Sequence, residues 1–134
     1  MAVFVDTSGV VATLNPRDEN HPAARARWIE LLERDEILHT TNYAIVESLA
    51  VLSRRLGFSA VRAFQADVVP VLTIFWVDPD VHGRAVSALL TAGERHLSLV
   101  DCVSFEVMRR LDLDTAFAFD AHFAEQGFRS LPSA

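Results

Sequence analysis

The 134-residue sequence contains no lysine, and all twelve of its basic residues are arginine. This absence excludes two mechanisms. A P-loop NTPase needs a lysine on the phosphates of its nucleotide, and Schiff-base chemistry needs a lysine amine as nucleophile. The catalytic groups of this chain must therefore be sought among its other polar residues.

The sequence also has little cysteine and no long apolar run. Because Cys102 is its single cysteine, an internal disulfide is excluded, and a reducing cytoplasm is the expected compartment. No apolar run reaches the length of a membrane span. The first residues, MAVFVDTSG, lack the basic region and long apolar stretch of a signal peptide. We therefore expect a cytoplasmic protein that does not associate with a membrane.

Positive charge is also scarce, since the formal net charge is -6 and the sequence pI is about 5.2. Such a chain does not bind nucleic acid through its overall charge, so a nucleic-acid partner would need a local arginine patch. Hydrophobic residues make up 51% of the sequence, and nine residues are phenylalanine, which is ample for a packed core. Without repeats or long linkers, residues 1–134 are expected to form one domain.

Apolar segments alternate with amphipathic ones along the chain. Capping residues are predicted at Asn42, Ser59, Asp78 and Ser98. Helices are expected at 8–14, 23–34, 43–56, 59–69, 79–91, 98–111 and 120–126, and strands at 2–5, 37–40, 71–77, 115–119 and 128–130. This alternation predicts an α/β protein with three α/β/α layers, in which helices cover both faces of a mainly parallel sheet of four to five strands.

Four acidic residues stand out because they lie in apolar surroundings. Asp6 and Asp120 end two strands that are expected to be central, and ligands bind beyond the carboxyl ends of such strands. Glu47 in AIVESLAVL and Asp101 in LSLVDCVSF lie on apolar helical faces. We therefore expect these four carboxylates to form one site.

Four adjacent carboxylates cannot all be ionised without a counter-charge. No arginine adjoins any of them in the sequence, so a divalent cation is the expected partner. Oxygen ligands without histidine or cysteine favour Mg²⁺ or Mn²⁺. Two such ions, about 4 Å apart, can activate a water and stabilise the leaving oxygen in phosphodiester hydrolysis. The pattern therefore favours a nuclease.

Four segments carry a family resemblance: VDTSG, YAIVESLAVLSRR, LSLVDCVSFEVMRR and FAFDAHF. In order, spacing and flanking elements they resemble the PIN-domain ribonucleases, specifically the VapC-like toxins of VapBC toxin–antitoxin pairs. The resemblance spans nearly the whole chain. It implies metal-dependent RNA cleavage, homodimerisation and inhibition by a VapB-like antitoxin encoded nearby.

The resemblance assigns roles to individual residues. It makes Asp6, Glu47, Asp101 and Asp120 the metal ligands and catalytic residues, and Ser8 the hydroxyl that supports them. One position departs from the pattern, because many members carry Thr or Ser where this chain has Ala118. Contacts with RNA are expected from the arginines that end the two acid-bearing helices, which are Arg54, Arg55, Arg109 and Arg110.

Each acid also has a purely structural interpretation. Asp6 could cap a turn, Asp101 could complete the S-x-x-D capping box that starts at Ser98, and Asp120 could cap the last helix. Glu47 could face solvent. The four arginines could match helix dipoles. For the whole chain, the alternative is a catalytically weak PIN-like module that binds RNA or a protein partner. A phospho-accepting receiver domain is disfavoured because that fold normally uses a lysine. The sequence does not identify the RNA target.

Overall fold

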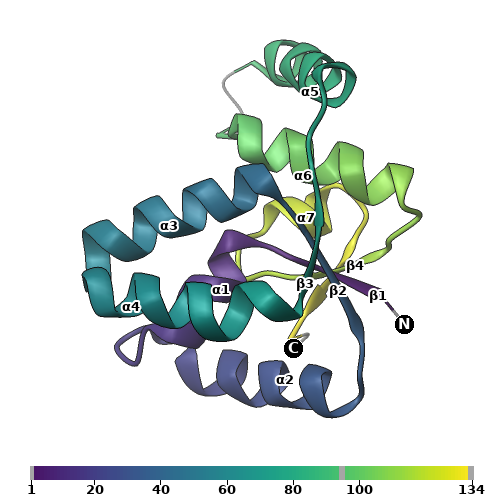
Figure 1. The fold of residues 1–134 in the computed structure, drawn as a ribbon. Helices are drawn as coiled ribbons and strands as arrows, with labels where there is room; N and C mark the ends of the chain where they lie inside the picture. Colours follow the sequence, from purple (N-terminus) through teal and green to yellow (C-terminus); the bar gives the residue numbers. More distant parts are fainter. Residues whose placement is uncertain (1, 94–95, 133–134) are drawn as a thin grey trace.

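The computed structural model describes residues 2–93 and 96–132 and contains a five-stranded parallel sheet (Figure 1). Every pair of neighbouring strands is parallel, and the strand order is β3-β2-β1-β4-β5. The strands are β1 (Ala2–Val5), β2 (Ile37–Thr41), β3 (Leu72–Phe75), β4 (Thr115–Phe117) and β5 (Arg129–Leu131). The predicted α/β class with a parallel sheet is confirmed.

Helices cover both faces of the sheet, which gives three layers (Figure 1). One face carries α1 (Thr7–Leu14), α2 (His21–Glu33), α4 (Phe58–Ala63), a π-helical segment (Phe64–Val68) and a 3-10 turn (Val69–Val71). The other carries α5 (Pro79–Ala92), α6 (Leu99–Arg110) and α7 (His122–Glu125). The remaining helix, α3 (Asn42–Leu56), contacts both α1 and α6.

Two apolar clusters pack against the two faces of the sheet because successive strand residues point to opposite sides. In β1, Val3 and Val5 join the cluster beneath α1 and α2, whereas Phe4 joins the cluster beneath α6. All three side chains are buried. The pattern AVFV therefore holds the first strand at the centre of the sheet, directly before Asp6.

The structure confirms two predicted helix caps and corrects two others. Asp78 accepts a hydrogen bond from the Val81 amide at the start of α5, and Ser98 begins a capping box at α6. By contrast, Asn42 does not cap α3, because the hydroxyl of Thr41 accepts the Ala44 amide. The predicted cap at Ser59 is also wrong, since α4 follows Gly57 without a side-chain cap. Among the helices of the described residues, none is long and apolar enough to cross a membrane.

Candidate active site

Three aspartates meet at the carboxyl edge of the sheet. Asp6 directly follows β1, and Asp120 lies three residues beyond the end of β4. These strands are parallel neighbours, so their carboxyl ends lie side by side. Asp101 reaches the same point from the first turn of α6. One carboxylate oxygen from each of the three lies within 4.8 Å of the others.

Asp6 is the most deeply buried of the three, with only 3% of its surface exposed. Its Oδ2 accepts two hydrogen bonds from Ser8, one from the backbone amide at 3.1 Å and one from the hydroxyl at 2.6 Å. The same carboxylate caps the N-terminus of α1. The structural role and the site role of Asp6 are therefore compatible.

The hydroxyl of Ser8 links two segments of the site. It donates to Asp6 and accepts a 2.9 Å hydrogen bond from the backbone amide of Phe119, the residue before Asp120. This places one side chain between the end of β1 and the segment that follows β4. Ser8 therefore fixes the relative position of two carboxylates, and its support does not come from the position of Ala118, which is buried in the cluster beneath α6.

We expect Ser8→Ala to lower stability by about 1–2 kcal/mol, because it leaves the Phe119 amide without its acceptor. We also expect it to reduce cleavage of RNA roughly tenfold to a hundredfold, as loss of a supporting hydrogen bond at a metal site does. Urea denaturation and single-turnover cleavage would measure the two effects. Ser53→Ala, on the exposed side of α3, serves as control. Equal activity of both variants would contradict the positioning role of Ser8.

Asp101 and Asp120 are also held by the backbone around them. Oδ2 of Asp101 accepts the Ser98 amide at 3.1 Å, which completes the predicted capping box. Oδ1 of Asp120 accepts the His122 amide at 3.0 Å. The backbone amides and the Ser8 hydroxyl bind only one of the two carboxylate oxygens of each aspartate. The second oxygen of each can therefore serve another ligand.

Burial and mutual repulsion disfavour the ionised forms of two of these acids. Desolvation raises the pKa of Asp6 to about 7, with a further contribution from the charge of Asp120, while the hydrogen bonds from Ser8 oppose the rise. The pKa of Asp120 is also raised, first by burial and then by the charge of Asp101. A divalent cation would relieve both the desolvation and the repulsion, so the donor set fits a metal.

The fourth predicted ligand, Glu47, reaches the same cleft from α3 but lies outside the group of three close oxygens. The cleft has a volume of about 300 Å³. Buried hydroxyls attach α3 to the segment that follows β1: Thr7 donates to the carbonyl of Ala44 at 3.2 Å and accepts from Ser48 at 3.2 Å. These bonds hold Glu47 beside the aspartates.

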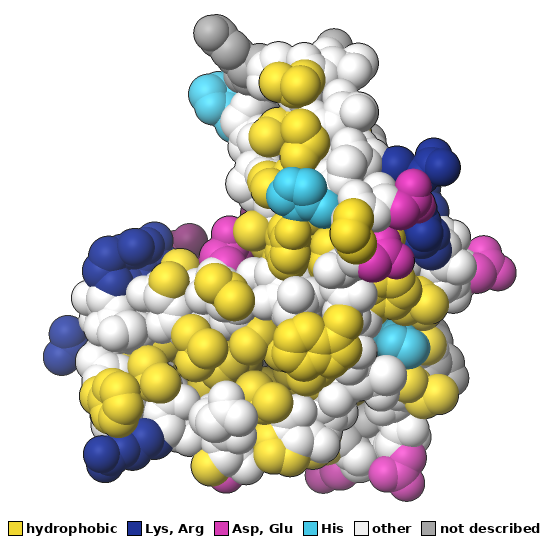
Figure 2. All heavy atoms as spheres, turned by 45° about the horizontal axis from the view of Figure 1, so that its top comes forward, with side chains coloured by type: hydrophobic (Ala, Val, Ile, Leu, Met, Phe, Trp, Pro, Cys, Tyr) yellow, Lys and Arg dark blue, Asp and Glu magenta, His cyan; other side chains and the backbone are white. Residues whose placement is uncertain are grey.

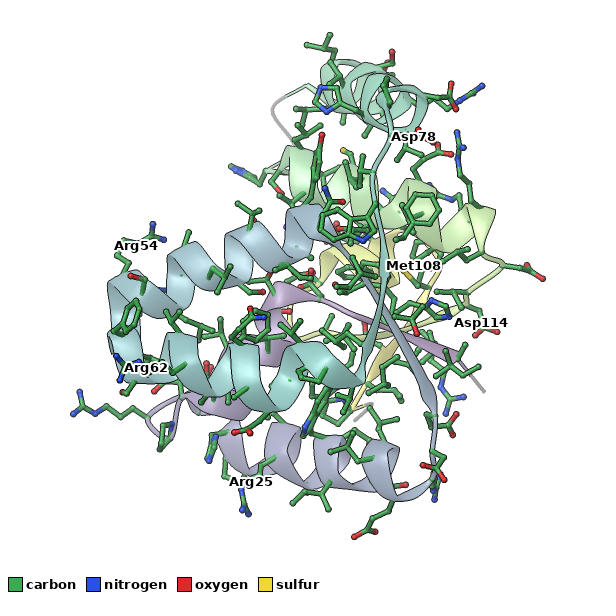
Figure 3. The ribbon with its side chains drawn as sticks, viewed as in Figure 1. Arg25, Arg54, Arg62, Asp78, Met108 and Asp114 are labelled. Atoms are coloured by element: carbon green, nitrogen blue, oxygen red, sulfur yellow. The ribbon has the colours of Figure 1, made fainter. Side chains whose placement is uncertain are left out.

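The four predicted arginines occupy different environments. Arg55 lines the cleft, whereas Arg54 projects outward from the end of α3 (Figure 3). Arg109 bonds Gln126 at 3.0 Å and lies over the ring of Phe128. Arg110 binds Asp80 and Glu106. Of these four arginines, Arg55 is therefore the one that shares a cleft with the acids.

Comparisons with known proteins agree with this geometry. A family model described as the PIN domain matches residues 3–129. This chain belongs to the PIN-domain family. It is 34% identical over 127 residues to the 23S rRNA-specific endonuclease VapC20 of Mycobacterium tuberculosis. The matched region covers 94% of this chain and 95% of the relative. The predicted resemblance to VapC-like toxins is confirmed.

Solved PIN-domain structures match the whole fold. The crystal structure of VapC20, a sarcin–ricin loop cleaving toxin, superposes with a TM-score of 0.85 at 33% identity, and the match covers 95% of this chain and 96% of that one. FitAcB from Neisseria gonorrhoeae matches with a TM-score of 0.68 at 14% identity, and the match covers 96% of this chain and 95% of that one. VapBC2 from Rickettsia felis, bound to promoter DNA, matches with a TM-score of 0.70 at 12% identity, and the match covers 97% of each chain. The similarity to FitAcB and VapBC2 is a similarity of fold alone.

This PIN-domain cleft also contains residues that the sequence pattern did not predict. Asp18 lines it from the loop between α1 and α2, and Phe119 lines it beside Asp120. Val11 and Val51 complete its apolar part. Glu47, Val51 and Arg55 are spaced four residues apart, and this spacing predicts that they lie on one face of α3 and line the cleft together. No sequence pattern predicts that Asp18 lies at the cleft, because its position depends on the conformation of the loop between α1 and α2.

Proposed function

We propose that this PIN-domain protein is a metal-dependent endoribonuclease and the toxin of a VapBC-type toxin–antitoxin pair. The observation that carries the proposal is the meeting of Asp6, Asp101 and Asp120 within 4.8 Å at the carboxyl edge of the sheet. The 34% identity to the endonuclease VapC20 supports the same activity. The proposed reaction is hydrolysis of an RNA phosphodiester bond.

We propose Mg²⁺ or Mn²⁺ as the ion, held by the three aspartates and by Glu47. Carboxylate oxygens without histidine or cysteine are the donors that these hard cations prefer. When bound, such a cation offsets the charge of the phosphate and lowers the pKa of a water molecule. Asp6 and Asp120 keep their orientation through the hydrogen bonds of Ser8 and His122. The residues of the chain therefore provide a preorganised set of oxygen ligands.

We also propose that the substrate is 23S ribosomal RNA, cut at the sarcin–ricin loop. The support is the specificity of VapC20 for 23S rRNA and for this loop, because VapC20 matches this chain over 94% of its length. Ribosomal RNA as substrate agrees with the expected cytoplasmic location. The test is incubation of protein, purified free of antitoxin, with ribosomes and with a synthetic loop, followed by mapping of the new RNA ends. A single cut in the loop is the expected result.

Removal of metal should abolish cleavage and lower stability together. With EDTA we expect no cutting, and with Mg²⁺ or Mn²⁺ at about 100 times its dissociation constant we expect a stability gain of about 2.7 kcal/mol. Asp101→Asn should lose most of this gain, whereas Asp67→Asn, on an exposed helical segment, should keep it. Thermal melting and cleavage assays measure the two effects.

Two results of this experiment would contradict the proposal. Cutting that continues in EDTA would exclude metal dependence. A folded protein that cuts neither ribosomes nor the loop with either ion would favour the alternative of a module that binds RNA or a protein without cutting.

We further propose that the protein forms a homodimer and binds a VapB-like antitoxin. An apolar face supports an interface, since Val46 and Trp76 are 65% and 69% exposed. Figure 2 shows hydrophobic side chains running across this side of the molecule. A groove of about 390 Å³, lined mainly by Tyr43, Val46 and Ala50, adjoins Glu47 on the same helix. Light scattering of the protein, alone and with its antitoxin, distinguishes the two partners by mass.

A further inference from the structure

The cleft contains two chemically different sets of groups. Asp6, Asp101 and Asp120 form the acidic set, which the proposed reaction uses. The second set is Phe119, two valines and Arg55, which line the same cleft together with Asp18. The proposed hydrolysis assigns no role to this second set. Its combination of an aromatic ring with a cation is typical of sites that bind a base and its phosphate.

The aromatic group is Phe119, which is partly buried against the cluster beneath α1 and α2. Its backbone amide is fixed by the hydroxyl of Ser8, and its ring meets the ring of Phe117 at 6.0 Å in an edge arrangement. The ring is therefore held in place directly beside Asp120. An aromatic ring fixed next to the reacting phosphate is placed to stack on a neighbouring base.

The cation is Arg55, which shares one face of α3 with Glu47 and Val51 at intervals of four residues. Eight residues of helix separate Arg55 from Glu47 by roughly 12 Å along the axis. Within residues 2–93 and 96–132, no salt bridge to Arg55 is found. Figure 2 shows basic side chains gathered at the left edge, where α3 ends in Figure 1. The guanidinium of Arg55 is therefore free to bind a phosphate in the part of the cleft that lies away from Glu47.

The size of the cleft limits what can bind between Phe119 and Arg55. At about 300 Å³ the whole cleft is at the lower limit of small-molecule sites, which run from about 300 to 1,000 Å³. That space suits a single nucleotide rather than a base pair. A base can present its face to a side chain only when it is unstacked, as in loops, bulges and strand ends.

We propose that Phe119 and Arg55 form a subsite for one unpaired nucleotide next to the scissile phosphate, with its base on Phe119 and its distal phosphate on Arg55. This subsite rests on the proposed endoribonuclease function and specifies its substrate class. The enzyme selects RNA in which a nucleotide beside the cut is extruded from its stack.

The first experiment tests the phosphate contact with Arg55→Gln. In an Asp6→Asn background, where no cutting occurs, the slope of log affinity against log salt for single-stranded RNA should fall by about 0.7. In the active protein, KM should rise roughly tenfold while kcat changes by less than about twofold. Arg62→Gln is the matched control, because Arg62 lies on the neighbouring α4 and stacks on Phe58 outside the cleft.

The second experiment tests the base contact with substrates that lack one base. Removing the base on one side of the cut should slow the wild type on the order of tenfold. Phe119→Leu should cleave the intact substrate slowly, and removal of the base should not slow it further. The reason is that the substitution and the missing base each remove the same stacking interaction. Phe58→Leu, at an exposed ring outside the cleft, should behave as wild type.

The outcomes separate the subsite from the function on which it rests. If the wild type cuts no RNA with any metal, the proposed function fails. If it cuts, and Arg55→Gln matches Arg62→Gln in KM and salt slope, the subsite is wrong while the nuclease stands. If Phe119→Leu remains as sensitive to a missing base as the wild type, the base contact is wrong. Arg55 is exposed, so the first experiment does not depend on the stability of the Phe119 variant.

Discussion

Asp6→Asn should abolish RNA cleavage and, in the same protein, increase the stability of the metal-free fold above pH 7. The loss of activity follows from the removal of one charged oxygen ligand at the centre of the cluster. Metal-assisted charge stabilisation contributes several kcal/mol, so we expect a rate reduction on the order of a thousandfold or more. Single-turnover cleavage at saturating metal measures it, with Asp67→Asn as a control.

The gain in stability follows from the raised pKa of Asp6. Its carboxyl titrates near 7 in the folded protein and at 3.8 when unfolded, so the folded state holds a proton that the unfolded state has lost between these values. The metal-free wild type should therefore lose stability as pH rises from about 4 to about 7. Three pKa units correspond to about 4 kcal/mol, an upper bound for this contribution. Asparagine is neutral throughout and avoids the loss.

The difference between the two proteins cancels the titrating groups that do not interact with Asp6 and keeps its interaction with Asp120. We expect Asp6→Asn to match the wild type near pH 4 and to exceed it by roughly 1–3 kcal/mol at pH 8, because asparagine still accepts a hydrogen bond from Ser8. Urea denaturation in EDTA across this range gives the curve. A metal-free variant less stable than the wild type at pH 8 would show that the hydrogen bonds of Asp6 outweigh its desolvation.

The three aspartates could be predicted from the sequence because their positions follow from a topological rule. Apolar strands at the centre of a parallel sheet place the residues after them at one edge. Asp6 follows β1 directly, and the apolar stretch before Asp120 supplies β4. The S-x-x-D pattern at Asp101 predicted the start of α6, and the structure shows it there. Local signals were sufficient for these elements.

The cap of α3 could not be predicted in the same way. Asn42 has the stronger capping propensity, but α3 begins directly after β2, so the last strand residue, Thr41, has the extended backbone that a cap requires. The side chain of Asn42 instead accepts the amide of Val77 from a segment 35 residues away. The π-helical turn at Phe64–Val68 likewise has no local signal.

The lining of the cleft beyond the acids was also beyond the sequence pattern. Asp18 belongs to a polar loop, and Phe119 could equally have been core. Whether these residues line the cleft depends on how the loop between α1 and α2, helix α3 and the segment after β4 pack together. The prediction that Arg55 contacts RNA rested on its position at the end of a helix. Arg109 also lies at the end of a helix, but it bonds Gln126 and does not line the acidic cleft, whereas Arg55 does. Position along a helix does not determine which groove an arginine faces.

Gly9→Ala should destabilise the protein and reduce cleavage, although alanine is the better helix former. A Cβ built at Gly9 lies 2.5 Å from the carbonyl oxygen of Phe117 and 2.5 Å from its ring. That carbonyl accepts the amide of Asp6 in the pairing of β1 with β4, at 3.1 Å, so it cannot move freely. The ring is fully buried against Trp28. Gly9 therefore permits α1 to approach the sheet directly above the site.

A matched control exists in the same chain. Gly83 lies inside α5, and a Cβ there meets no atom within 4 Å among the described residues. Gly83→Ala should stabilise the protein by about 0.5–1 kcal/mol through helix propensity. Gly9→Ala should lose roughly 1–3 kcal/mol through overpacking. The same chemical change should thus have opposite signs at two helical positions, as measured by urea denaturation of the metal-free proteins.

The effect of Gly9→Ala on cleavage depends on how α1 makes room. If the helix moves away from Phe117, it carries Ser8 with it and breaks the bridge between Asp6 and the Phe119 amide. A displacement of about 1 Å can cost a hundredfold in rate, so we expect a loss of that order even where the protein is fully folded. Stability equal to that of Gly83→Ala would show that the contact relaxes without cost. A loss of stability without a loss of cleavage would show that the carboxylates keep their positions when α1 shifts.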